Sequence, residues 1–210
     1  MDPDRIGHPA ARPVVQRLHA RPATLGVGRL LCVDGPAGSG KTTLAAAVEA
    51  LVPGARVVHV DDLLQGWSGL PGLSGQLEGL LRPLGRGEPG TYRRWDWEAS
   101  GWAGTVTVPP GPLLVLEGVG SGAAAYADLE TLLVWVEAPH DLRMRRGLER
   151  DGDAFAPHWQ RWAAAEAELF TREQTRDRAD VVVDGRDGTV REVSPLDASP
   201  GARSSSDAPR

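Results

Sequence analysis

The sequence predicts an α/β fold, a three-layer sandwich in which a mostly parallel five-stranded sheet lies between two layers of helices. Three observations favour this fold. Short apolar runs recur along the chain, segments of helix-forming composition separate them, and a glycine-rich turn joins the first run to the first such segment. A chain of 210 residues is long enough for one domain of this kind with a hydrophobic core.

Five apolar runs are the expected strands, and each is bounded by turn residues. They are Leu30–Asp34, Val57–Asp61, Leu113–Glu117, Leu132–Glu137 and Val181–Asp184. Their leucine-rich and β-branched composition is typical of strands that are buried on both faces of a parallel sheet. The carboxyl ends of parallel strands meet at one edge, so we expect ligand chemistry at that edge.

Helix-forming segments lie between these runs. We expect helices at Thr42–Val52, Gln76–Arg82, Asp141–Arg150 and His158–Arg172, with a short helix around Val14–Ala20 at most. Thr105–Val108, which two prolines follow, is expected as a short edge strand.

Composition predicts where the domain begins and ends. Residues 1–24 are rich in Pro, Arg and Ala and are expected to form a flexible extension, and residues 25–185 form the domain. Residues 186–210 carry mostly polar residues, Gly and Pro, so we expect a disordered tail.

Charge and hydropathy exclude several classes of protein. A formal net charge of −5 argues against a nucleic-acid partner that is bound by general phosphate contacts. No apolar run approaches the roughly 20 residues of a membrane helix, and the first residues lack the apolar core of a secretion signal. We therefore expect a cytoplasmic protein with no membrane partner. Cys32 is the only cysteine and lies in an apolar run, where a buried thiol is expected.

The glycine-rich turn carries the most specific motif of the chain. Gly35–Thr42 fits the P-loop (Walker A) pattern G-x-x-x-x-G-K-S/T at every specified position, between an expected strand and an expected helix. The backbone N–H groups of such a turn surround phosphate, and the helix dipole favours its negative charge. The expected nucleotide-binding residues are Gly35, Ala37, Gly38, Ser39, Gly40, Lys41, Thr42 and Thr43. The fold class is therefore that of a P-loop NTPase.

Two side chains of this motif have specific roles in phosphate chemistry. Lys41 is expected to bridge the β- and γ-phosphates of a nucleoside triphosphate. Thr42 places a hydroxyl group on a magnesium ion that neutralises charge on the transferred group. The motif thus predicts ATP and Mg²⁺ as cofactors.

Carboxylates follow two of the expected strands, at the edge where ligands bind. Asp61 and Asp62 end the second strand, and Glu117 ends the third. A carboxylate here can accept a hydroxyl proton from an acceptor molecule or help to hold magnesium. Asp61 is the candidate base, with Asp62 and Glu117 as alternatives. The same residues could instead cap the segments that follow them.

The segments GPAGSGKTT, VDDLL, WDW, LEGV and DLRMRRGLERD together resemble the uridine kinase-like group of P-loop kinases, over residues 30–185. The resemblance implies that Asp61 is the catalytic base and that Glu117 helps to hold magnesium. It also implies that Asp96 and Trp97 contact the sugar and base of a nucleoside. Ser100 stands where the family has a histidine.

Arg143, Arg146 and Arg150 have i, i+3, i+7 spacing and share one helix face. In the resembling family such arginines belong to a lid over the phosphates, which makes Arg146 a candidate catalytic residue and Arg150 a candidate substrate contact. The alternative is a solvated helix whose arginines pair with nearby acids.

Aromatic residues gather in the loop-like stretch that contains the WDW segment. Tyr92 and Trp97 are candidate contacts for a planar substrate, although large aromatic side chains are also buried simply because they are apolar. His59 lies inside an expected strand, and we expect it to pack in the core rather than to bind a ligand.

These residues favour an ATP-dependent kinase that phosphorylates a hydroxyl group of a small molecule, with nucleosides such as uridine or cytidine as the first choice. The alternative is a nucleotide-dependent switch or regulatory P-loop NTPase, in which Asp61 positions water and no acceptor exists. Composition does not determine the acceptor, the preferred triphosphate or the oligomeric state.

Overall fold

The computed structural model describes residues 7–152 and 156–193. The helices and strands are, in chain order, α1 (Ala11–His19), β1 (Arg29–Asp34), α2 (Lys41–Leu51), β2 (Ala55–His59), α3 (Leu73–Gly85), β3 (Gly90–Asp96), β4 (Gly101–Val108), β5 (Leu113–Glu117), β6 (Leu132–Glu137), α4 (His140–Asp151), α5 (Ala156–Glu173), α6 (Thr175–Arg178), β7 (Val181–Asp184) and β8 (Val190–Glu192). Short 3₁₀ helices are η2 (Val60–Leu63), η3 (Gly66–Ser68), η4 (Leu70–Gly72) and η5 (Ala124–Tyr126).

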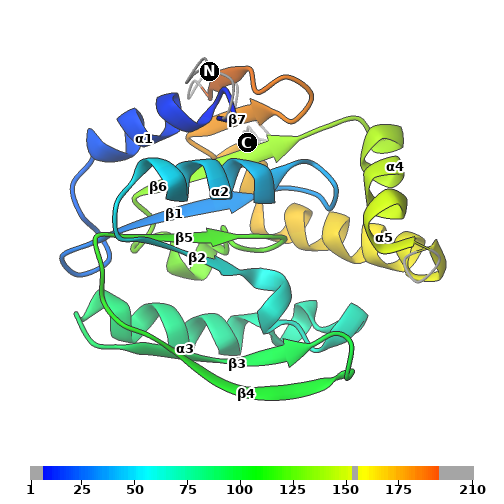
Figure 1. Cartoon of the computed structure of the whole chain (residues 1–210), viewed down its shortest axis with the longest axis horizontal. Helices are drawn as coiled ribbons and strands as arrows, with labels where there is room; N and C mark the ends of the chain where they lie inside the picture. The colour runs from blue at the N-terminus through cyan, green and yellow to red at the C-terminus, as the bar shows by residue number, and fades with distance from the viewer. Residues whose placement is uncertain (1–6, 153–155, 194–210) are drawn as a thin grey trace, which may run out of the picture.

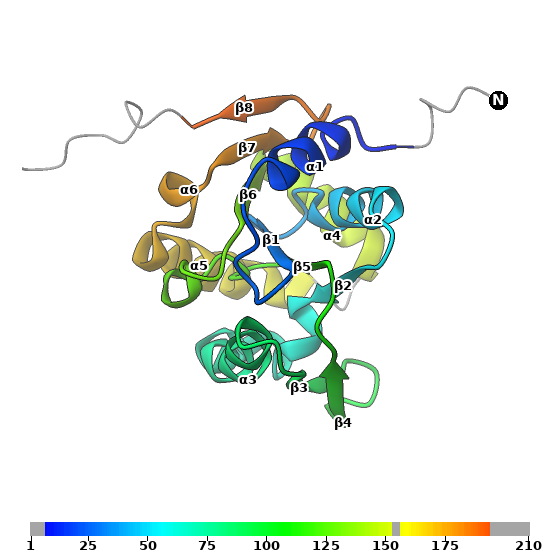
Figure 2. The same cartoon turned by 90° about the vertical axis from the view of Figure 1, so that its left-hand side faces the viewer.

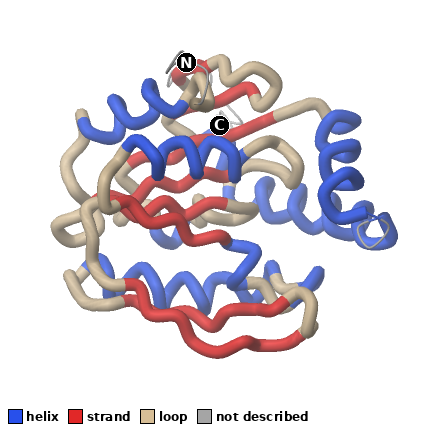
Figure 3. Tube along the Cα trace, viewed as in Figure 1, coloured by secondary structure: helices blue, strands red, loops and turns tan. Residues whose placement is uncertain are grey.

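The centre of the molecule is a six-stranded sheet with the order β2-β5-β1-β6-β7-β8 (Figures 1 and 3). The first five strands are parallel, and β8 is antiparallel to β7. The predicted fold class, a mainly parallel sheet in an α/β sandwich, is therefore confirmed. The five predicted strands are all present, and β8 adds a sixth strand beyond the domain boundary expected at residue 185.

Alternate residues of the strands face two separate hydrophobic cores. In β1, Leu31 and Val33 belong to the core that includes residues of α1 and α2, while Leu30 and Cys32 belong to the core that includes residues of α3 and α5. Figure 2 shows helices on both sides of the sheet. The sheet is thus covered on both faces, which explains why its strands are continuously apolar.

The N-terminal segment differs from the flexible extension that we expected for residues 1–24. The residues of α1 at positions 11, 14 and 18 lie on one helix face and are buried in the core shared with α2. Arg21 also pairs with Asp180 at 2.8 Å, just before β7. The short helix expected around Val14–Ala20 is present as Ala11–His19, and it packs on the domain instead of belonging to a flexible extension.

Replacing Leu18 with alanine is expected to lower the free energy of unfolding by about 2–5 kcal/mol, because a fully buried leucine leaves a cavity. Gln16 lies on the exposed side of the same helix, and Gln16→Ala should change stability by less than about 0.5 kcal/mol. Urea denaturation measures both variants. Equal stabilities would show that α1 does not dock on the domain in solution.

The stretch expected as an aromatic loop is a β-hairpin of β3 and β4 that forms a second sheet. Trp95 and Trp102 face each other across its strands, with ring centroids 5.2 Å apart. The expected edge strand at Thr105–Val108 is the end of β4, and α3 packs against β3 (Figure 1). Cross-strand aromatic contacts of this kind stabilise a hairpin.

Among the described residues, no helix is both long enough and apolar enough to cross a membrane. The expected tail lies outside the described residues from position 194 onwards.

Candidate functional site

The glycine-rich loop connects β1 to α2 at the carboxyl edge of the sheet. Gly40 precedes α2 with φ of 107°, and no side chain caps the helix. The first N–H groups of α2 therefore remain available to an anion. Gly38 has φ of 76°, and a Cβ atom there would lie 2.4 Å from the carbonyl oxygen of Arg143. Both glycines are required by the backbone geometry of the loop.

Lys41, the first residue of α2, is buried with 7% of its surface exposed. Its Nζ atom donates hydrogen bonds to the carbonyl oxygens of Gly35 at 2.8 Å and Pro36 at 3.0 Å. The Lys41 side chain thus folds back over the phosphate loop. A nucleotide phosphate would exchange these neutral acceptors for charged ones.

Thr42 and Glu117 lie together although 75 positions separate them in the sequence. The Thr42 hydroxyl donates to Glu117 Oε1 at 3.2 Å. Glu117 is buried at the end of β5, and its Oε1 atom also lies 2.5 Å from Nδ1 of His59. This hydrogen bond raises the pKa of His59 above its ordinary value.

The expectation that His59 packs in the core is wrong. Its side chain is 46% exposed and lies at the end of β2, which is the edge strand of the main sheet. An edge strand is not covered by a further strand, so a polar side chain at its end can reach both solvent and Glu117. The apolar neighbours of His59 in the sequence did not reveal this position.

The residues around the loop fit a magnesium–nucleotide complex. The buried hydroxyl oxygen of Ser39 has no hydrogen-bond partner among the described residues, which leaves it for a ligand. Residues 7–152 and 156–193 contain no cluster of three or more His, Cys, Asp or Glu side chains that could hold a metal alone. Magnesium is commonly held by one or two protein oxygens together with substrate phosphates, and Thr42 and Glu117 would supply such oxygens.

Asp34 is a site residue that the sequence analysis missed. It is fully buried at the end of β1 and accepts hydrogen bonds from the N–H groups of Gly35, Gly120 and Gly122 at 2.7–3.0 Å. Burial raises its pKa to about 6, although these hydrogen bonds oppose the shift. Asp34 ties the start of the phosphate loop to the loop that follows β5. Its place directly before Gly35 was the available signal.

Asp61 and Asp62 lie just beyond β2, in η2. The strand ends two residues earlier than expected because its ladder with β5 ends at the pair His59 and Glu117. Asp61 is exposed, whereas Asp62 is half-buried, and burial raises the pKa of Asp62. The positive charges of His59 and Arg94 oppose this shift. Both carboxylates thus lie just beyond the carboxyl end of β2, next to the end of β5 that carries Glu117.

Trp97 connects the hairpin to this edge. Its indole N–H donates to the backbone carbonyl of Asp61 at 3.2 Å, and 37% of the residue is exposed. Its ring meets the edge of Trp67 with centroids 5.2 Å apart. Trp67 also stacks on His158 of α5 at 5.0 Å. Trp97, Trp67 and His158 thus form an aromatic wall beside the candidate base Asp61.

Two other predicted substrate contacts have different surroundings. Tyr92 is buried in the core next to α3, because it lies on the inward face of β3. Asp96 accepts the N–H of Ala99 at 2.9 Å and stabilises the hairpin turn. That either residue contacts a substrate stays a prediction.

Helix α4 brings two of its arginines to the phosphate loop. Arg146 donates to the carbonyl oxygens of Gly38 at 3.3 Å and Ser39 at 3.4 Å, and to that of Gly185 at 3.0 Å. Arg143 donates to the Ala37 carbonyl at 3.1 Å. These contacts use the outer, carbonyl side of the loop. The side chain of Arg150 lies outside the described residues.

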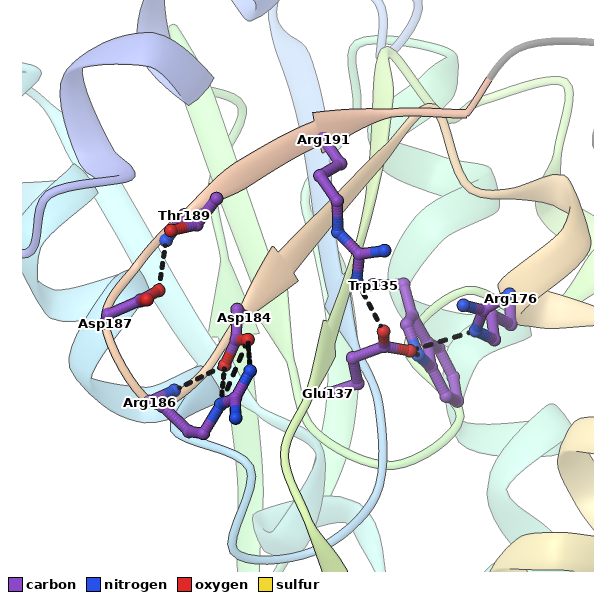
Figure 4. A network of polar contacts seen from close by, with 8 residues as sticks. All are labelled: Trp135, Glu137, Arg176, Asp184, Arg186, Asp187, Thr189 and Arg191. Atoms are coloured by element: carbon purple, nitrogen blue, oxygen red, sulfur yellow. Dashed lines mark hydrogen bonds and ion pairs between the residues drawn. The ribbon is translucent and has the colours of Figure 1, made fainter.

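A polar network supports the strand ends behind the loop (Figure 4). Glu137, at the end of β6, accepts hydrogen bonds at 2.7–3.2 Å from Arg176, Arg191 and Trp135. Its backbone carbonyl accepts the N–H of Gly185 at 2.8 Å. A Cβ atom on Gly185 would lie 1.9 Å from the Ser39 carbonyl oxygen, so the phosphate loop packs directly against this strand end.

Comparison with solved structures identifies proteins of the same fold. A protein described as a possible uridine kinase from Bacillus stearothermophilus aligns with a TM-score of 0.55 and 22% identity, over 81% of this chain and 98% of that chain. A candidate fructose transport system kinase from Silicibacter sp. TM1040 aligns with a TM-score of 0.53 and 24% identity, over 78% and 92%. No protein-family model matches the chain, and no curated protein sequence is significantly similar to it.

The two structural neighbours confirm that this chain has the fold of the uridine kinase-like and related P-loop kinases, as its motifs suggested. At these identities the likeness establishes the fold alone, because one fold supports many different reactions.

Proposed function

We propose that the protein transfers the γ-phosphoryl group of ATP to a hydroxyl group of a small molecule, with a nucleoside as the preferred acceptor class. The observation that carries this proposal is the assembly of Lys41, Thr42 and Glu117 at one loop, beside Asp61 and its aromatic neighbour Trp97. The two structural neighbours, described as a possible uridine kinase and a candidate sugar-transport kinase, support a phosphotransferase.

Each residue has a distinct task in this proposal. The N–H groups of the loop and the Lys41 ammonium group bind the phosphates and stabilise charge on the transferred group. Magnesium, when bound, neutralises further phosphate charge, and Thr42 and Glu117 would hold it. Asp61 accepts the proton from the acceptor hydroxyl as that oxygen attacks phosphorus. Arg146, which already touches the loop through Gly38, adds positive charge near the phosphates.

The aromatic wall favours a kinase over a switch that uses water as its acceptor. Trp97 keeps more than a third of its surface exposed while its indole N–H is bonded next to Asp61. An exposed indole beside the base offers a stacking surface for a planar acceptor, which water does not need.

An ADP-release assay with a panel of acceptors tests the function. The panel contains nucleosides, nucleoside monophosphates, sugars and pantothenate-like alcohols, and an acceptor-free reaction serves as the control. Release that rises with one class of acceptor supports a kinase and identifies the class. Acceptor-independent hydrolysis, with no response to any member, would instead support the switch.

Trp97→Ala is expected to raise the KM of the acceptor by about 5- to 150-fold, because stacking of a base on an aromatic ring is worth about 1–3 kcal/mol. The KM of ATP should stay the same. Trp102→Ala is the matched control, because Trp102 lies in the same hairpin and packs against Trp95 and Arg93. Equal increases of the acceptor KM in both variants would show that the hairpin matters only for stability.

A further inference from the structure

A buried ion pair holds the phosphate loop from the side opposite α2. The Arg143 guanidinium of α4 lies 3.1 Å from the Glu166 carboxylate of α5, and the two side chains are only 12% and 3% exposed. No part of the proposed phosphoryl transfer uses this pair. Because the pair is buried, each charge is stabilised by the other charge and by nearby hydrogen bonds instead of by water.

The pair binds both polar groups of one loop residue. Glu166 Oε2 accepts the backbone N–H of Ala37 at 2.9 Å. Arg143 donates to the backbone carbonyl of Ala37 at 3.1 Å. Next along the loop, Gly38 approaches the backbone of Arg143 so closely that a Cβ atom would collide with it. The loop is therefore fixed against α4 at two consecutive residues.

Helix α5 provides a rigid support for Glu166. Trp162 and Leu169 on the same helix are buried in the core, with 5% and 7% of their surfaces exposed. The helix that carries Glu166 is therefore anchored to the core on both sides of this residue. The Ala37 N–H and the positive charges of Lys41 and Arg143 oppose the increase in pKa that burial of Glu166 causes.

We infer that Glu166 and Arg143 are positioning residues, which hold the Ala37 peptide so that the loop N–H groups converge on the nucleotide phosphates. This inference rests on the proposed nucleotide binding. A carboxylate alone beside this loop would repel phosphates, and the guanidinium group 3.1 Å away cancels its charge. The pair thus orders the loop without adding net negative charge.

Removing either charge of the pair, or both, should weaken nucleotide binding to different extents. Glu166→Gln removes the charged acceptor and should weaken binding of a non-hydrolysable ATP analogue with magnesium by about tenfold. Arg143→Met removes the ion-pair partner of the carboxylate and the hydrogen bond to the Ala37 carbonyl, and it should weaken binding more, by about 100-fold. The double variant Arg143→Met/Glu166→Gln should bind more tightly than Arg143→Met alone, because it removes the repulsive charge. Isothermal titration calorimetry measures all three affinities.

A second measurement does not depend on nucleotide. Hydrogen exchange of the Ala37 amide, followed by NMR in the nucleotide-free protein, should accelerate about tenfold or more in Glu166→Gln. Glu130→Gln is the matched control, because the side chain of Glu130 is only 9% exposed and lies 3.2 Å from Arg178, and none of its hydrogen bonds or ion pairs among the described residues reaches the phosphate loop. Glu130→Gln should leave both Ala37 exchange and analogue affinity unchanged.

The outcomes separate the inference from the proposed function. Unchanged exchange of the Ala37 amide in Glu166→Gln would overturn the positioning role, even if Arg143→Met fails to fold. Faster exchange together with weaker binding would support it. A wild-type protein that binds no ATP analogue, but whose Ala37 exchange still accelerates in Glu166→Gln, would refute the proposed function and show that the pair holds the Ala37 peptide without serving nucleotide binding.

Discussion

Replacing Lys41 with alanine or with arginine is expected to lower turnover by at least about 10²–10³-fold, the usual cost of losing one donor that stabilises transition-state charge. Lys41 is buried and contacts the carbonyl oxygens of both Gly35 and Pro36. The planar guanidinium fork of arginine is larger than an ammonium group and cannot occupy the same position inside the loop. A coupled assay of ADP release measures the loss.

Nucleotide affinity separates this effect from a general loss of structure. The backbone N–H groups of the loop remain in both variants, so weak binding of ATP should persist while turnover is lost. Thermal unfolding of the same variants checks that they are folded. Near-normal activity of Lys41→Arg would contradict the proposed role of the ammonium group.

Asp61→Asn is expected to lower acceptor-dependent transfer by about 10²–10⁴-fold, the usual contribution of general base catalysis. Asparagine keeps the size of the side chain and most of its hydrogen bonding, but it cannot take the proton of an acceptor hydroxyl. ATP affinity should barely change. If Asp61 only capped the segment that follows, asparagine would be nearly as good a cap and turnover would stay intact.

Asp62→Asn is the control for this prediction, because Asp62 is the adjacent carboxylate and is half-buried. Its replacement should have a smaller effect on transfer than Asp61→Asn. Unchanged transfer in Asp61→Asn would remove Asp61 from the mechanism, and the role of base would pass to Asp62 or Glu117. An equal loss of acceptor-independent hydrolysis, with no acceptor in the panel, would favour a residue that positions water.

The phosphate loop could be predicted because its chemistry is contained in eight consecutive residues. Glycines at Gly38 and Gly40 adopt the positive φ angles that the turn requires, and Lys41 begins the helix that follows. The main strands could also be predicted, because burial on both faces leaves continuous apolar runs. The parallel sheet then placed Glu117 at the ligand edge, as expected.

The surroundings of the predicted substrate residues could not be read from local patterns. Tyr92 and Trp97 lie in the same aromatic stretch, yet the first is buried in the core and the second is partly exposed beside Asp61. The difference arises because Tyr92 lies on the inward face of strand β3, whereas Trp97 follows that strand in the turn before β4. His59 was misplaced for a related reason, since only the strand order shows that β2 is an edge.

The sequence by itself determined the phosphate loop, the main strands and the edge at which the chemistry is expected. These features depend on residues that are adjacent or regularly spaced, and local backbone geometry relates them directly to structure. The tertiary structure alone decided that His59 reaches Glu117 across 58 positions and that Glu166 reaches Ala37 across 129. Such pairs depend on which helices and strands pack together. Neither the secondary-structure propensities of the residues nor their spacing along the sequence determines that packing.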